Sequence, residues 1–155
     1  MILGIIAACS GQAKDSLEGY SLKPGWYKLE GQHRVSVFPD GAPEKIIEEF
    51  PLDSFACVTA EDARRRSEEE VVQGMTAEGY DVLEVNITPY KDSVRAVSPP
   101  NDTVRDSISF TVIEYNSEFN VMTMTLEGAG ETDEGPLKLI TKITNTWVSD
   151  DCLDT

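Results

Sequence analysis

Three thiols and one imidazole are the groups best suited to chemistry in this chain of 155 residues. The cysteines are Cys9, Cys57 and Cys152, and the single histidine is His33. A nucleophilic side chain needs a base within hydrogen-bond reach, and a zinc site needs several His or Cys ligands. One histidine offers little of either, so we expect a non-enzymatic protein without a cofactor or a bound metal. A hydrolase that joins His33 to an Asp or Glu is the enzymatic alternative.

Carboxylates form two acidic clusters, one at Glu131, Asp133 and Glu134 and one at the C-terminus. Oxygen ligands of this kind suit calcium, but neither cluster has the spacing of a calcium loop. We therefore predict a solvated, glycine-rich acidic loop over 128–136. The chain carries 28 acidic and 13 basic residues, a net charge of −15. Such a field repels polyanions, so we expect no nucleic-acid partner.

The residues before Cys9 are all apolar, and a polar stretch of small residues follows from Ser10 to Ser16. An apolar run that ends in small residues is typical of a secretory signal. Ile6-Ala7-Ala8-Cys9 resembles the lipobox of bacterial lipoproteins. That resemblance implies cleavage before Cys9 and a thioether link from its thiol to diacylglycerol.

The lipobox predicts where the protein works. Acyl chains at about 0.8 kcal/mol per buried CH₂ hold a protein durably on a bilayer. Ser10, rather than Asp, after the lipidated cysteine implies the outer membrane, with the protein facing the periplasm. Because the apolar run is short and no Lys or Arg precedes it, we expect the true start to lie upstream. The alternative is a buried N-terminal strand in which Cys9 is inert.

Cys57 and Cys152 remain once Cys9 is lipidated. Disulfides persist in an oxidising compartment, and an even number of cysteines supports a bridge. The two residues are predicted to form a disulfide that ties the start of a helix to the C-terminus. Two unrelated free thiols are the alternative.

The helix is expected to begin after Thr59, because Thr59 and Asp62 have the spacing of a capping box. Three Arg–Glu pairs four residues apart continue it from Arg64 to Glu70, and Gly74 and Gly79 bracket its end.

The rest of the domain is strand-like, because apolar and polar residues alternate with a period of two. Strands are expected at 25–38, 45–52, 83–87, 94–97, 108–112, 122–126 and 137–147. The predicted fold is α+β and mainly β. It is a curled antiparallel sheet of about seven strands, a half-barrel, with one helix closing one side. Residues 1–9 are the signal end, 10–21 a flexible tether and 22–155 a single domain.

Four short elements occur in a fixed order along this domain: Leu22-Lys-Pro-Gly-Trp26, Cys57-Val-Thr-Ala-Glu-Asp-Ala63, Val121-Met-Thr-Met-Thr125 and Asp150-Asp-Cys152. Together they resemble a family of small exported Gram-negative proteins that is known only as a domain of unknown function. The resemblance spans Leu22 to Cys152. It implies an exported protein and brings no activity with it.

Aromatic and methionine side chains on alternating positions indicate what the curled sheet holds. The predicted set for an apolar pocket is Trp26, Phe110, Met122, Met124 and Trp147. Curled antiparallel sheets can enclose a lipid or another hydrophobic ligand, and adaptable methionines suit a loosely specific site. An ordinary hydrophobic core is the alternative for these side chains. We expect a lipid-anchored envelope protein that binds a hydrophobic ligand or an envelope component. A structural or protein-interaction module without a pocket is the alternative function.

Overall fold

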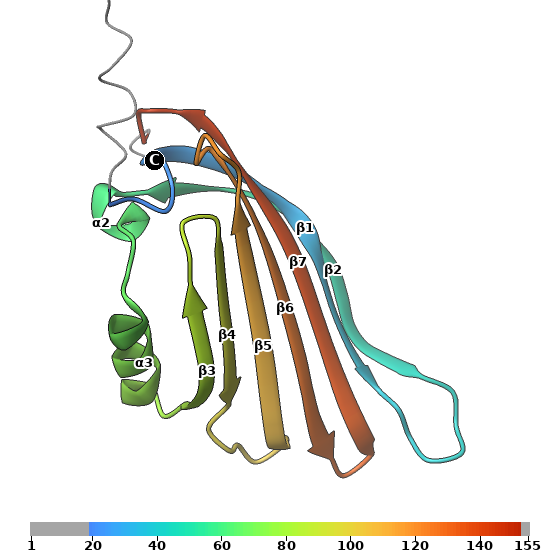
Figure 1. Ribbon diagram of the computed structural model, residues 1–155. Coiled ribbons are helices and arrows are strands. Elements are labelled where there is room, and N and C mark those ends of the chain that lie inside the picture. The colour runs from blue at the N-terminus through green and yellow to red at the C-terminus, as the bar shows by residue number, and fades with distance from the viewer. Residues whose placement is uncertain (1–18, 153–155) are drawn as a thin grey trace, which may run out of the picture.

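Seven strands and two short helices make up the computed structural model, which describes residues 19–152 (Figure 1). The residues of the lipobox, including Cys9, lie outside the described residues. In chain order the elements are β1 (Gly25–Val37), β2 (Lys45–Val58), α2 (Ala60–Ala63), α3 (Glu68–Ala77), β3 (Asp81–Ile87), β4 (Lys91–Val97), β5 (Arg105–Tyr115), β6 (Val121–Thr132) and β7 (Gly135–Ser149).

The strands form one antiparallel sheet in the order β2-β1-β7-β6-β5-β4-β3. The last strand, β7, pairs with β1 as well as β6, so β2 and β3 are the two edges of an unclosed sheet. The sheet curls over α2 at one end, and α3 lies beside β3 (Figure 1). The predicted fold class, a curled antiparallel sheet that is mainly β, is confirmed.

Alternation gives the sheet two chemically different faces. The inner face, toward which the sheet curls, carries Met122, Met124 and Leu126 of β6, and cross-strand partners extend this apolar surface over β5 and β7. The outer face carries Thr123, Thr125 and Glu127 from the same strand. This arrangement follows from the predicted period of two.

The helical segment differs from the single helix expected. It begins after Thr59, where the predicted capping box with Asp62 is present, but it ends at Ala63. A second capping box, formed by Ser67 and Glu70, starts α3. At the break, the backbone N–H of Arg65 donates to Gly19 O at 2.7 Å and not to a carbonyl of α2. Residues 19–21 of the predicted tether are therefore hydrogen-bonded to this segment.

The small core of the molecule lies at the end of the sheet that carries α2, which we call the packed end. Leu22, Tyr27 and Ala63 are its buried residues, and Tyr27 is 0% exposed. The partly buried hydrophobic residues around them are Tyr20, Leu29, Val58, Tyr115, Met122 and Trp147. The Tyr27 hydroxyl donates to Lys23 O at 2.7 Å, and burial raises the pKa of Tyr27 to about 12.

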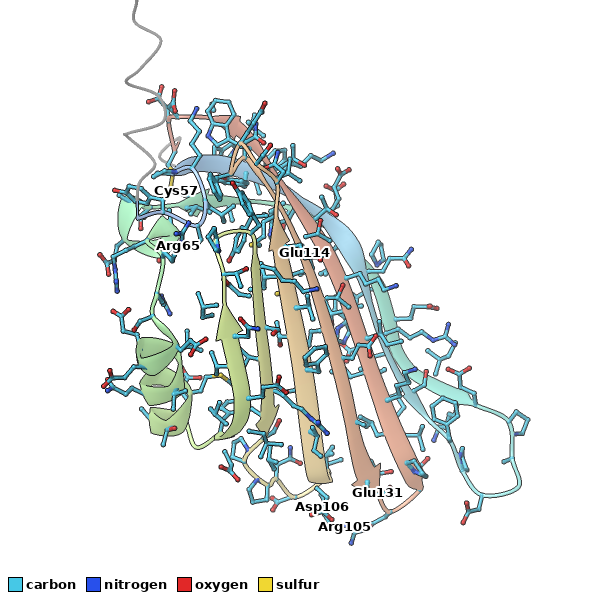
Figure 2. All side chains as sticks on the ribbon, in the orientation of Figure 1. Cys57, Arg65, Arg105, Asp106, Glu114 and Glu131 are labelled. Atoms are coloured by element: carbon cyan, nitrogen blue, oxygen red, sulfur yellow. A yellow bond between two sulfur atoms is a disulfide. The ribbon has the colours of Figure 1, made fainter. Side chains whose placement is uncertain are left out.

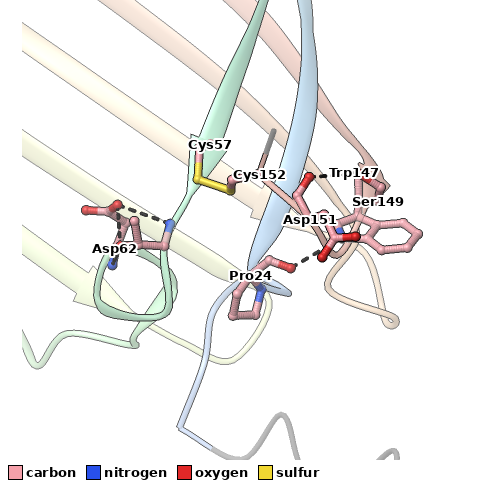
Figure 3. Close-up of a disulfide and its surroundings, with 8 residues drawn as sticks. Pro24, Cys57, Asp62, Trp147, Ser149, Asp151 and Cys152 are labelled. Atoms are coloured by element: carbon pink, nitrogen blue, oxygen red, sulfur yellow. Dashed lines mark hydrogen bonds between the residues drawn. A yellow bond between two sulfur atoms is a disulfide. The ribbon is translucent and has the colours of Figure 1, made fainter. Parts of the chain in front are cut away.

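The disulfide between Cys57 and Cys152 fastens the packed end (Figure 3). It joins the end of β2 to the segment after β7, across a sequence separation of 95 and a Cα–Cα distance of 5.3 Å. Beside it, Trp147 Nε1 donates to Pro24 O at 3.3 Å. Gly25 has a φ of +142°, and a Cβ there would collide with Ser149 O and the Trp147 ring. The Pro-Gly-Trp element therefore has a structural role, in that only glycine lets β7 approach this closely.

Candidate functional site

The end of the inner face opposite the packed end contains a hollow of about 680 Å³, which we call the inner hollow. Its walls are the C-terminal part of α3, the loop between β4 and β5, and strands β5 to β7. Its lining residues are Met75, Glu78, Tyr80, Ser98, Pro99, Pro100, Asn101, Val104, Ser107, Ile108, Ser109, Thr111, Leu126, Gly128, Ala129, Leu137 and Leu139. Ligand pockets commonly measure 300–1,000 Å³ and are mostly apolar with a few polar groups.

Small residues at the centre of the sheet create this hollow. Ser109 of β5 pairs with Gly128 of β6, and Gly128 pairs with Leu139 of β7. The α3 helix packs against the edge strand β3, and within residues 19–152 no helix lies above this central part of the inner face. Among the described residues, the buried hydrophobic side chains are Leu22, Tyr27, Val37, Ala63 and Ala96. The inner face is therefore apolar but incompletely covered.

A second hollow, of about 720 Å³, lies on the outer face of the same strands. Its apolar lining includes Ile108 and Phe110, which are 37% and 42% exposed. Its charged lining is balanced, with Glu84 and Glu127 against Arg95 and Lys138. Its lining consists of strand residues and Phe38 of the loop after β1, whereas the inner hollow also has walls from α3 and the β4–β5 loop, so the inner hollow is the better enclosed of the two.

The predicted pocket residues divide between the two faces. Met122, Met124 and Trp147 share the inner face, since Met122 pairs with Asn145 and Trp147 pairs with Tyr27. Trp26 and Phe110 lie on the outer face.

Four of the five contact three different parts of the molecule. Trp26 stacks on Phe55 at 5.8 Å, and Phe110 lines the outer hollow. Met122 and Trp147 pack around the core of the packed end, and Lys23 Nζ lies 3.5 Å from the Trp147 ring centre. The inner hollow is lined by other residues, among them Met75 and Tyr80.

His33 lies on the inner face of β1 and is neither isolated nor fully exposed. Its Nδ1 is 2.8 Å from Thr141 Oγ1, and its Nε2 is 3.7 Å from a Glu48 carboxylate oxygen. Hydroxyl, imidazole and carboxylate thus stand in the order of a nucleophile, a base and an orienting acid. However, Thr141 is only 7% exposed and lies on β7, which is paired on both sides. Backbone N–H groups engaged in a ladder cannot serve as an oxyanion hole, so this geometry gives the hydrolase alternative little support.

A hydrogen-bonded pair, Asp92 of β4 and Tyr115 of β5, lies next to the core of the packed end. The Tyr115 hydroxyl donates to Asp92 Oδ2 at 2.7 Å. Burial raises the pKa of Asp92, and burial together with the neighbouring Asp92 carboxylate raises the pKa of Tyr115. Asp92 Oδ1 and Arg65 Nε are buried without a hydrogen-bond partner, as is Asn145 Oδ1.

The predicted acidic loop is instead the tip of a hairpin. Strand β6 continues to Thr132 and β7 begins at Gly135, so Asp133 and Glu134 form the turn. Asp133 pairs with Arg105 at 3.2 Å and Glu134 with Lys45 at 2.6 Å. Within residues 19–152, no three His, Cys, Asp or Glu side chains are grouped as metal ligands. No helix in this range is both long and apolar enough to cross a bilayer.

Comparison of this chain with family models, with curated proteins and with solved structures finds no match.

Proposed function

We propose that this protein is a binding protein of the bacterial cell envelope, lipid-anchored at Cys9, that holds a hydrophobic ligand in its inner hollow. The observation that supports the binding step is the incompletely covered apolar inner face. Leu126, Leu137 and Leu139 line a space of about 680 Å³ next to small residues of β5 and β6. Because burying apolar surface contributes about 25 cal/mol per Å², a ligand with an apolar chain gains from entering this space.

The small size of the buried core within residues 19–152 agrees with this role. A sheet of this size normally buries its apolar face against another layer. Here the buried cluster of Leu22, Tyr27 and Ala63 lies at the packed end, whereas Leu126 and Leu139 at the hollow are only partly buried. A ligand would complete the second layer.

A dye-binding assay tests the proposal on the full chain. N-phenyl-1-naphthylamine fluoresces in apolar surroundings and should bind the protein with saturation. Ser109→Trp should weaken binding at least tenfold, because Ser109 lines the hollow opposite Gly128 and an indole would fill it. Thr123→Trp is the matched control, since Thr123 is exposed on the outer face of β6 and lines neither of the two hollows. Equal affinities for the two variants would contradict the proposal.

Native mass spectrometry of protein purified from membranes gives an independent readout. We expect a bound mass that is lost on organic extraction. Protein that is always empty, and that also fails to bind the dye, would exclude a ligand.

Lipid anchoring needs its own experiment, because Cys9 lies outside the described residues. Metabolic labelling with a palmitate analogue should label the wild-type protein in the membrane fraction. Cys9→Ser should lose both the label and the membrane location. Persistent labelling of Cys9→Ser would reject the lipid anchor at Cys9. The ligand site is tested separately, by the dye-binding assay.

The alternative function, a protein-interaction module, is favoured by the edge strand β2. Ile46, Ile47 and Phe55 on this strand are 47%, 54% and 52% exposed. Edge strands present unpaired backbone groups to which another chain can add a strand. Ile47→Lys should release a partner that uses this edge while leaving dye binding unchanged.

A further inference from the structure

The charge around the inner hollow favours one class of ligand. Glu78 is the one charged side chain among the described residues that line this hollow. The remaining lining is apolar or carries neutral hydroxyl, amide and backbone groups. A ligand that binds here therefore meets a carboxylate and no lysine or arginine in the lining.

The position of Glu78 adds a second negative contribution. Glu78 is the C-cap residue of α3, and the last turn of this helix contains no basic residue. The C-terminus of a helix carries the negative end of the helix dipole, which favours a cation and disfavours a carboxylate. A carboxylate at this place is unfavourable for the helix by itself. It becomes favourable when a positive group lies next to it.

The lower edge of the sheet, near the hollow, also carries acidic side chains. Asp106 and Glu131 lie at this edge with Arg105 (Figure 2), and Asp106 stands between the lining residues Val104 and Ser107 in the chain. The basic residue labelled at this edge of the sheet is Arg105, and its guanidinium lies 3.2 Å from the Asp133 carboxylate. Both side chains of this pair are largely exposed, at 65% and 95%, so Asp133 lowers the positive potential of Arg105 only modestly.

On the basis of the proposed function, we infer that the ligand of the inner hollow is a cationic amphiphile. Its apolar chain lies along Leu126, Leu137 and Leu139, and its positively charged head group lies beside Glu78. An anionic amphiphile, such as a fatty acid, would place its carboxylate next to Glu78 and the C-terminus of α3. Opposite charges a few ångströms apart attract and like charges repel by comparable amounts, so the two head groups are well discriminated.

Three ligands with the same chain and different head groups test this inference. Dodecylamine, dodecanol and dodecanoate are titrated at neutral pH below their micelle concentrations, each displacing N-phenyl-1-naphthylamine from the full-length protein. We expect the amine to bind at least tenfold more tightly than dodecanoate, with the alcohol between them. The preference for the amine should decrease with added salt, because Glu78 is exposed and salt screens it.

Variants at Glu78 locate the effect. Glu78→Gln should weaken dodecylamine about tenfold and leave dodecanol unchanged, and Glu78→Lys should reverse the order of amine and dodecanoate. Glu127→Gln is the matched control, because it removes the same charge from the outer face of β6. Both Glu78 substitutions are at an exposed helix end, and Lys is favoured there, so we expect both variants to fold.

The outcomes separate this inference from the proposed function. If dodecylamine and dodecanoate bind equally, or if Glu127→Gln acts like Glu78→Gln, a site for cationic head groups is rejected while a hydrophobic ligand site stands. If neither the dye nor any dodecyl compound binds, the proposed function fails and this inference fails with it.

Discussion

The packed end and the open end of this sheet are built from the same seven strands but have opposite characters. At the packed end, Tyr27 and Ala63 are buried and the Cys57–Cys152 disulfide joins β2 to the C-terminal segment. At the open end, Ser109 and Gly128 line a hollow that is bordered by α3 and the β4–β5 loop. The difference indicates that stability is concentrated at one end, so that the other can keep apolar surface free for a ligand.

Loss of the disulfide should have the largest effect on the packed end. Cys57→Ser combined with Cys152→Ser opens a loop with a sequence separation of 95 residues. On the chain-entropy model this lowers the free energy of unfolding by about 4–5 kcal/mol. Urea denaturation of both proteins without reductant measures the difference. A loss below about 1 kcal/mol would mean that the disulfide is not what stabilises this end.

A matched pair of core truncations compares the two ends directly. Tyr27→Ala removes a fully buried ring and should lower the free energy of unfolding by about 3–5 kcal/mol. Leu139→Ala removes a partly buried side chain at the inner hollow and should lower it by less than about 2 kcal/mol. Dye affinity should change in the opposite order, being reduced most by Leu139→Ala. Equal losses of stability would contradict a concentration of the core at the packed end.

The two capping boxes offer a smaller and better matched comparison. Ser67→Ala uncaps α3 and Thr59→Ala uncaps α2, and each should lower stability by about 1 kcal/mol. Because α3 forms a wall of the inner hollow, only Ser67→Ala should also weaken dye binding. If Thr59→Ala weakens binding as much, the hollow is not independent of the packed end.

The smallest expected effect is the pH dependence of the ion pair that joins α2 to α3. Arg64 and the backbone N–H of Ser67 lower the pKa of Glu70 to about 2, from 4.5. A lowered carboxyl pKa contributes stability that is fully present above pH 4.5 and is lost as the pH falls through the folded pKa. The melting temperature of Glu70→Gln should therefore be below that of wild type at pH 6, and the difference should shrink as the pH falls toward 2 and vanish below it. Glu69→Gln removes the same charge one residue earlier, and it should show a smaller difference at pH 6.

Several differences from the predicted elements arise where local composition and long-range pairing disagree. Gly128 and Gly130 indicated a loop, but both lie in β6 because Leu139 and Val104 approach them closely. The strand expected at 45–52 is longer in the structure, because β2 continues through Pro51 to Val58. Proline is tolerated there because β2 is an edge strand and need not donate on its free side.

The candidate site was harder to predict than the fold. Alternation placed Met122 and Met124 on one face, and they do share the inner face. Phe110 lies on the other face because it pairs with Glu127, a register set by the turn between β5 and β6. Glu78 was not among the residues predicted to line a pocket. The signal for it was a carboxylate at the C-terminal end of a helix whose last turn contains no Lys or Arg.

The sequence by itself determined the antiparallel class, the first capping box and the partners of the disulfide, because these depend on alternation, on residues three apart and on an even cysteine count. Only the tertiary structure decided the register between strands, the break between α2 and α3, and the position of the inner hollow. Each of these depends on contacts between residues far apart in the chain, such as Gly19 with Arg65 and Gly128 with Leu139. Local propensities do not encode such contacts, because a shift of one residue in register exchanges the two faces of a strand.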